Sequence, residues 1–155
     1  MTPQDFEALL SPIADRVRGR ALDASLDQEL NVEFGPTSNT FKQIEAGCHA
    51  AIAAGWMCNR EGGGIKYGRV IKPAESLGGL SVDVVDMDTV KGPHHRHPNG
   101  EIDLVMPITP GAKFDGRGAG WLVYGPGTAH SPTVSEGRAL VLYLLPGGAI
   151  EFTKT

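Results

Sequence analysis

The chain has 155 residues, of which 41% are hydrophobic and 21% charged, as expected for one globular domain with a substantial core. The net charge is -4 and no block of Lys and Arg occurs, which argues against nucleic acid as a partner. No apolar run reaches the roughly 20 residues of a membrane span, and the first residues lack the features of a signal peptide. Because Cys48 and Cys58 are the only cysteines, we expect free thiols and a cytoplasmic protein.

The first 60 residues are predicted to be helical. Apolar residues at helical spacing predict three helices, over residues 4–17, between Asp23 and Gly35, and over about 40–54. Asp23 is the expected N-cap of the second helix, and Thr40 that of the third. We interpret residues 1–60 as a helical N-terminal extension that packs on the remainder of the chain.

After residue 61 the pattern changes to short apolar runs at a two-residue period, separated by Gly, Pro and Asp turns. Strands are predicted near 65–72, 80–87, 93–97, 101–108, 112–115, 120–124, 128–134, 139–145 and 149–153. Many short strands with regular turns favour a β-barrel or sandwich. No Ser/Gly-rich linker separates the two parts, so we expect residues 61–155 to form a barrel that is one folded unit with the helices.

Histidines are concentrated in one short segment, and a carboxylate follows them. On a strand, His95 and His97 point to the same face, and Glu101 has the same parity, whereas His94 points away. Imidazoles that share a face with a nearby carboxylate indicate a site for a divalent metal ion. His130 follows a Gly-Pro-Gly turn and offers a third imidazole.

One further group of residues is interpreted as part of a pocket. The strand that begins at Ile65 is predicted to place Arg69 and Ile71 on the same face. If that face is internal, Arg69 needs an anionic partner, which is either Asp103 or the carboxylate of a substrate. Tyr143 is expected either to direct its phenol into the pocket or to pack within the barrel.

The spacing His-x-His-x3-Glu, followed by Gly-x5-Pro-Gly-x2-His, resembles the two sequence motifs of the cupin superfamily over residues 92–130. The resemblance implies a mainly β, cupin-type jelly-roll barrel that binds one metal ion through His95, His97, Glu101 and His130. Three histidines and a carboxylate accommodate Fe, Mn, Zn, Ni or Co. Cupins commonly dimerise, so we expect a homodimer or a higher homo-oligomer.

A more specific resemblance extends over nearly the whole chain. Five segments are similar to the 4-hydroxylaminobenzoate lyase family, namely residues 55–60, 64–73, 92–104, 120–127 and 142–152. The resemblance implies conversion of 4-hydroxylaminobenzoate to 3,4-dihydroxybenzoate with release of ammonia, in the catabolism of nitroaromatic compounds. The expected catalytic groups are Glu101, as ligand or as general acid/base, and the histidines at 95, 97 and 130. The expected contacts to this small aromatic carboxylate are Arg69, Asp103 and Tyr143.

Three alternative functions remain open at this stage. One is the related mutase, which rearranges a hydroxylaminobenzoate to an aminophenol acid. Another is a metal-dependent cupin dioxygenase, since three histidines around Fe(II) would suit it. The last is a non-catalytic cupin that binds a small molecule, which predicts binding without turnover and tolerance of His130→Ala.

Overall fold

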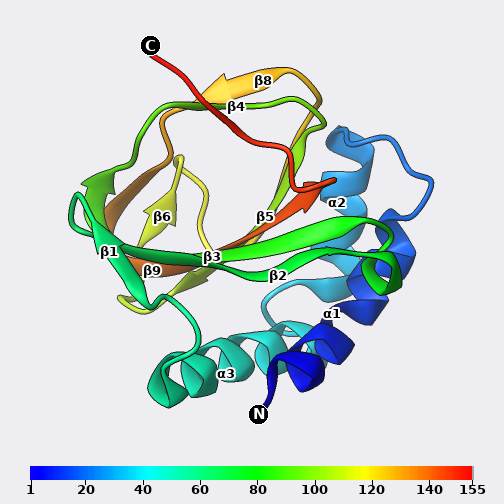
Figure 1. The fold of residues 1–155 in the computed structure, drawn as a ribbon, viewed down its shortest axis with the longest axis horizontal. Helices are drawn as coiled ribbons and strands as arrows, with labels where there is room; N and C mark the ends of the chain where they lie inside the picture. Colours follow the sequence, from blue (N-terminus) through cyan, green and yellow to red (C-terminus); the bar gives the residue numbers. More distant parts are fainter. Residues whose placement is uncertain (155) are drawn as a thin grey trace.

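The computed structural model describes residues 1–154, in which three α-helices precede ten β-strands (Figure 1). The helices are α1 (Pro3–Val17), α2 (Ala24–Phe34) and α3 (Asn39–Ala54), and a short 3-10 helix, η1 (Glu75–Leu77), lies between two strands. The strands are β1 (Arg60–Gly62), β2 (Ile65–Ala74), β3 (Leu80–Lys91), β4 (His95–His97), β5 (Glu101–Pro107), β6 (Lys113–Phe114), β7 (Gly120–Tyr124), β8 (Thr128–His130), β9 (Thr133–Pro146) and β10 (Glu151–Phe152). None of the helices described is both long and apolar enough to cross a bilayer.

Capping side chains set the helix boundaries. Asp23 accepts a hydrogen bond from a backbone amide in the first turn of α2, and Gly35 ends that helix, as predicted. The prediction that Thr40 caps the third helix is wrong. Ser38 takes this role, because its hydroxyl oxygen accepts a hydrogen bond from the Phe41 amide at 3.2 Å. The hydroxyl also donates to the Gly35 carbonyl at 2.7 Å, which joins the end of α2 to the start of α3.

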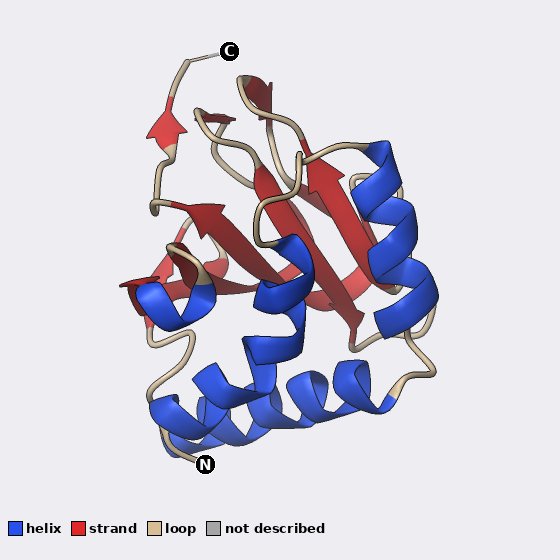
Figure 2. Cartoon of the chain, turned by 90° about the vertical axis from the view of Figure 1, so that its right-hand side faces the viewer, coloured by secondary structure: helices blue, strands red, loops and turns tan. Residues whose placement is uncertain are grey.

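The strands form two antiparallel sheets. The 7-stranded sheet has the order β1-β2-β3-β9-β5-β7, with β6 also paired to β9, and the 3-stranded sheet has the order β10-β4-β8. The helices lie along one side of the large sheet (Figure 2), whereas β4 and β8 lie on the opposite side (Figure 1). The predicted mainly β, cupin-type barrel with an N-terminal helical segment is therefore confirmed.

Alternation along the strands divides the apolar side chains into two clusters. Leu104 on β5 belongs to the cluster that includes the helix residues Phe6 and Ile44. Its neighbour Val105 belongs to a second cluster, which fills the interior of the barrel. Residues two apart on a strand share a face. Glu101, at the start of β5, therefore points into the barrel with Val105, where a polar site can form.

A β-bulge in β2 changes the expected orientation of one residue. Between Arg69 and Ile71, β2 advances by two residues while β3 advances by one, from Asp83 to Val82. Arg69 lines a cavity, but Ile71 packs in the cluster that contacts the helices. The prediction that Arg69 and Ile71 share a face is wrong, because the extra residue reverses the alternation.

Two other differences from the predicted strands concern the neighbourhood of the site. The short strand β1 was not predicted, since its three residues are all exposed and show no apolar alternation. The strand predicted over 128–134 is divided between the two sheets, into β8 and the start of β9. Pro132 lies at the division, and its lack of a backbone N–H prevents a continuous ladder.

Candidate metal centre and its cavity

Four predicted ligands are brought together inside the barrel. His95 and His97 lie on β4, Glu101 begins β5, and His130 ends β8. Because β4 and β8 pair antiparallel, His130 is directly opposite His95. Each side chain offers one ligand atom, and the four atoms lie within 4.8 Å of one another. His94 lies outside this cluster, where its Nδ1 atom is 2.7 Å from the hydroxyl of Thr153.

The geometry of the cluster fits a bound cation. The Nε2 atom of His95 lies 2.8 Å from that of His97 and 3.1 Å from that of His130. One Glu101 oxygen lies 3.2 Å from His97 Nε2 and 3.7 Å from His130 Nε2, and the other oxygen lies 3.7 Å from His95 Nε2. Within residues 1–154, neither oxygen of the buried Glu101 side chain has a hydrogen-bond partner. One divalent ion would satisfy this carboxylate and all three nitrogen lone pairs.

Hydrogen bonds on the far side of two imidazole rings select the tautomer that metal binding requires. His130 Nδ1 lies 2.6 Å from the Asp115 carboxylate, which can only accept, so Nδ1 carries the proton. His97 Nδ1 lies 3.0 Å from the Thr128 hydroxyl, which itself donates to the Gly125 carbonyl at 2.7 Å. Thr128 therefore accepts from His97 Nδ1. In neutral rings held in this way, both Nε2 lone pairs point into the centre.

Asp115 has a larger role than the sequence indicated. Its carboxylate also accepts hydrogen bonds from the Tyr124 hydroxyl and from the Thr133 amide, the latter at 3.0 Å. Burial raises the pKa of Asp115, but the hydrogen bonds from His130 and Tyr124 outweigh burial and lower the pKa. Asp115 is therefore an anion that orients His130. The sequence pattern Asp115-Gly116 indicated only a tight turn, and the turn is present, with a φ of 49° at Asp115.

Two buried carboxyl groups on β5 take opposite charge states. Burial raises the pKa of Glu101, but the adjacent His95 and His97 rings outweigh burial and lower the pKa to about 2. Asp103 is completely buried on the same face. Burial and then the charge of Glu101 raise its pKa well above the usual value. Glu101 is therefore the anionic member of the pair, and Asp103 favours the neutral form, which avoids a second buried negative charge beside Glu101.

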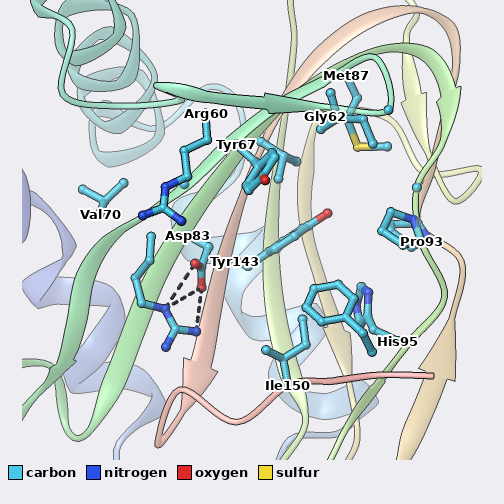
Figure 3. Close-up of a pocket in the computed structure, with 18 of the residues that line it drawn as sticks. Arg60, Gly62, Tyr67, Val70, Asp83, Met87, Pro93, His95, Tyr143 and Ile150 are labelled. Atoms are coloured by element: carbon cyan, nitrogen blue, oxygen red, sulfur yellow. Dashed lines mark hydrogen bonds and ion pairs between the residues drawn. The ribbon is translucent and has the colours of Figure 1, made fainter.

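A cavity of about 1170 Å³ opens beside the metal centre (Figure 3). Its walls come from β1, β2, β3, the start of β4 and the C-terminal residues 148–152. His95 reaches the lining, and the ring of Tyr143 lies next to it, with 6.4 Å between the ring centroids. Figure 3 shows the Tyr143 hydroxyl directed into the cavity. The cavity can therefore bring a small molecule to the edge of the His cluster.

Arg69 lines the cavity, but its anionic partner is not the predicted one. Its Nη2 atom lies 3.1 Å from the Asp83 carboxylate and donates to the Gly148 carbonyl at 3.2 Å. Its Nε atom lies 3.2 Å from the other Asp83 oxygen. The predicted Arg69–Asp103 pair is wrong, because Asp83 faces Arg69 on the adjacent strand. Asp103 lies beside Glu101 with no exposed surface, so it does not reach the cavity wall.

Comparison with known proteins connects this site to a family. A family model described as 4-hydroxylaminobenzoate lyase matches residues 8–152. The chain belongs to the 4-hydroxylaminobenzoate lyase family. A protein of this name from Nocardioides sp. (strain LMS-CY) is 32% identical, and the match covers 99% of this chain and 96% of the relative. Another from Pseudomonas putida is 31% identical, with 88% of both chains covered.

A solved structure with a similar course of the chain is the DMSP lyase DddQ from Ruegeria pomeroyi DSS-3. The match covers 97% of this chain and 95% of that one, with a TM-score of 0.48 and 17% sequence identity. At this level of similarity, the relationship carries no information about the reaction. The relationship to the hydroxylaminobenzoate lyases therefore rests on the sequence comparisons.

For this member of the lyase family, sequence reasoning missed three residues of the site region. Asp115 and Thr128 orient the ligand imidazoles, and Arg60 lines the cavity from the unpredicted strand β1. Thr128 has the parity of His130 on β8, which was a usable signal. Asp115 gave none, because it reaches the site through the pairing of β6 with the distant strand β9, and Arg60 gave none, because the three residues of β1 are exposed and show no apolar alternation.

Proposed function

We propose that this chain converts 4-hydroxylaminobenzoate to 3,4-dihydroxybenzoate (protocatechuate) and ammonia during the degradation of nitroaromatic compounds. The main support is the convergence of three imidazole Nε2 atoms and a buried carboxylate beside a cavity, in a member of this family. The reaction consumes one water molecule and releases one ammonia molecule. The N–O bond and the C–N bond break while two C–O bonds form, so no external oxidant is needed.

The residues that would hold a divalent metal ion are His95, His97, Glu101 and His130. Such an ion supplies Lewis acidity toward oxygen and lowers the pKa of bound water. Fe, Mn, Zn, Ni and Co all suit this donor set. Glu101 serves either as a ligand or as a general acid/base, since it is anionic and faces all three imidazoles.

Tyr143 is proposed to contact the substrate and to supply a proton. Its side chain lines the cavity next to His95. Burial and then the negative charge of Glu101 raise the pKa of Tyr143, so the phenol keeps its proton at neutral pH. A protonated phenol can donate to the hydroxylamine oxygen as the N–O bond breaks and the electron pair leaves with oxygen. This transfer makes the leaving group neutral.

The cavity wall suits an aromatic carboxylate. Apolar side chains that can pack against a ring include Val85, Met87, Ile150 and Phe152. Arg69 is proposed to add positive charge at the carboxylate end, although Asp83 already binds two of its nitrogen atoms. Asp103 is proposed to act on the substrate only indirectly, through the adjacent Glu101.

The test is an assay of purified protein with 4-hydroxylaminobenzoate under strict exclusion of oxygen. We expect ammonia and 3,4-dihydroxybenzoate in equal amounts. An aminophenol acid without ammonia would identify a mutase instead. Turnover that requires oxygen would identify a dioxygenase, and binding without turnover would identify a binding protein. Each of these three results would overturn the proposal.

A further inference from the structure

The cavity contains more positive than negative charge. Arg60, Arg69, Lys72 and Lys91 line it, together with the carboxylate of Asp83. Arg69 and Asp83 are joined by hydrogen bonds and compensate each other. Within residues 1–154, the side-chain nitrogen atoms of the other three cations lie more than 4.0 Å from every Asp and Glu carboxylate oxygen. The cavity therefore attracts anions, and a carboxylate is an anion that the proposed substrate carries.

We infer that Arg60 is the principal anchor for the carboxylate of the substrate. Arg60 begins β1, where it is opposite Tyr67 in the β1–β2 hairpin. Figure 3 shows its side chain extending from β1 to the side of the cavity where Asp83 lies, whereas His95 lies on the other side. The Tyr143 side chain lies between these two sides in the same view.

The hydrogen bonds of the two arginines distinguish their roles. A carboxylate binds an arginine best through two parallel N–H···O bonds on one edge of the guanidinium. In Arg69, the edge formed by Nε and Nη2 already binds Asp83, and Nη2 also binds the Gly148 carbonyl. The guanidinium of Arg60 has no such partner among the described residues. Lys72 can offer only a point charge without this planar geometry.

This placement deepens the proposed function, on which it rests, by assigning the residue that binds the carboxylate of the substrate. An aryl carboxylate held by Arg60 would extend across the cavity past Tyr143 toward His95. The carboxylate and the reacting nitrogen would then lie at opposite ends of the molecule. Substituents at opposite ends of the ring are in the para relation, so the cavity favours 4-substituted benzoates over 2-substituted ones.

The experiment measures binding of 4-aminobenzoate and of the uncharged 4-aminobenzamide by isothermal titration calorimetry. Neither probe contains the N–O bond, so the measurement does not depend on turnover. We expect wild type to prefer the benzoate. Arg60→Gln should weaken benzoate binding by about 10-fold or more, the effect of losing a charge-assisted hydrogen bond, and should leave benzamide binding unchanged. Arg60→Lys should restore part of the loss.

The matched control is Lys42→Gln, which removes an exposed cation on α3, away from the cavity. It should bind both probes as wild type does. Unchanged benzoate binding in Arg60→Gln would overturn the inference, as would equal weakening of both probes. A larger effect of Lys72→Gln than of Arg60→Gln would also overturn it. If instead the binding results hold and the anaerobic assay releases no ammonia, the proposed reaction fails while the carboxylate anchor stands.

Discussion

One residue outside the proposed ligand set determines how His130 faces the metal centre. Asp115 accepts a hydrogen bond from His130 Nδ1 at 2.6 Å and is itself held by Tyr124 and Thr133. A carboxylate behind a metal-binding imidazole fixes the ring and increases its basicity. His130 is also the most exposed of the four candidate ligands, at 12% for its side chain. It therefore depends most on such support.

We predict that Asp115→Ala weakens metal binding by about 10- to 100-fold, because His130 loses both its orientation and its fixed tautomer. Competition with a chromogenic chelator measures the affinity directly. Asp88→Ala is a suitable control, since Asp88 is an exposed carboxylate on β3. Equal affinities of the Asp115 and Asp88 variants would show that Asp115 does not support the metal centre.

The four proposed ligands could be found from sequence in two ways. His95 and His97 are two residues apart on β4 and share a face by local geometry, whereas Glu101 on β5 and His130 on β8 were completed by the motif spacing, which resembles that of cupins. Asp115 could not be found in this way. It is separated from His130 by the whole of β7, and nothing in the intervening residues indicates that the two side chains meet.

At the scale of secondary-structure elements, the bulge in β2 connects the sheet to the C-terminal segment. It leaves Arg69 on the cavity side, where Arg69 binds both Asp83 and the Gly148 carbonyl. Residues 148–152 then run along the cavity, and β10 pairs with β4. Arg69 thus has two roles: it holds the C-terminal wall of the cavity in place, and it adds positive charge to the cavity.

We predict that Arg69→Met lowers the free energy of unfolding by about 1 kcal/mol, because the ion pair is partly exposed and is screened by solvent. Amides of β10 should exchange faster with deuterium. Denaturant titration and hydrogen exchange provide the two measurements. Arg16→Met, which removes a more exposed pair with Glu33, should change neither. Unaltered exchange in β10 would contradict the role assigned to Arg69.

The helical segment and the first strand are joined through a core that contains both cysteines. Cys48 lies on α3, and Cys58 lies just before β1, where its thiol donates to the Val84 carbonyl at 3.4 Å. Burial raises the pKa of Cys58 from 9.0 to about 12 and raises the pKa of Cys48 as well. Both residues therefore remain neutral thiols in the folded protein, in agreement with the expectation of free thiols.

We predict that neither thiol reacts with Ellman's reagent in the native protein at pH 8, because thiolate is the reactive form. Both should react after denaturation. The unfolded chain loses these protons near pH 9, whereas the folded chain retains them, so the free energy of unfolding should fall as pH rises above about 9. Rapid labelling of one thiol in the native protein would contradict this assignment.

The elements themselves were predictable wherever one face is apolar over several residues. The helix α1 and the long strands show the 3.6- and two-residue periods in sequence because each buries one side. The strand β1, the bulge in β2 and the break at Pro132 were not predictable in this way. The residues of β1 are all exposed, the bulge is a shift in register against β3, and the break at Pro132 is a single residue, so none of them produces a local apolar period.

At the scale of the whole molecule, the packing of the helices supplies most of the apolar core, and the barrel interior holds the candidate metal site. The outer face of the large sheet packs on α1, α2 and α3 through an apolar cluster that includes Phe6, Ile44 and Leu104. The interior is then free to hold four polar ligands as well as a smaller apolar cluster. Stability therefore does not depend on the site alone, and removal of metal should weaken the fold without abolishing it.

We predict that free metal at a concentration of about 100 times its dissociation constant raises the free energy of unfolding by about 2.7 kcal/mol. For a domain of this size, the melting temperature of metal-free protein should be lower by roughly 5–10 °C. Thermal melting before and after chelation, and after metal is restored, measures the shift. His97→Ala should melt at one temperature under all three conditions. If the melting temperature of wild type did not change on chelation, this result would contradict metal binding at this centre.

The most direct test of the whole account is a metal titration of chelated protein, with ammonia release from 4-hydroxylaminobenzoate measured under exclusion of oxygen. We predict that the rate rises in proportion to bound metal and stops rising at one ion per chain. His97→Ala should remain inactive throughout. Full ammonia release by protein that contains no metal, or by the His97 variant, would contradict the claim that His95, His97, Glu101 and His130 form the metal centre of this reaction.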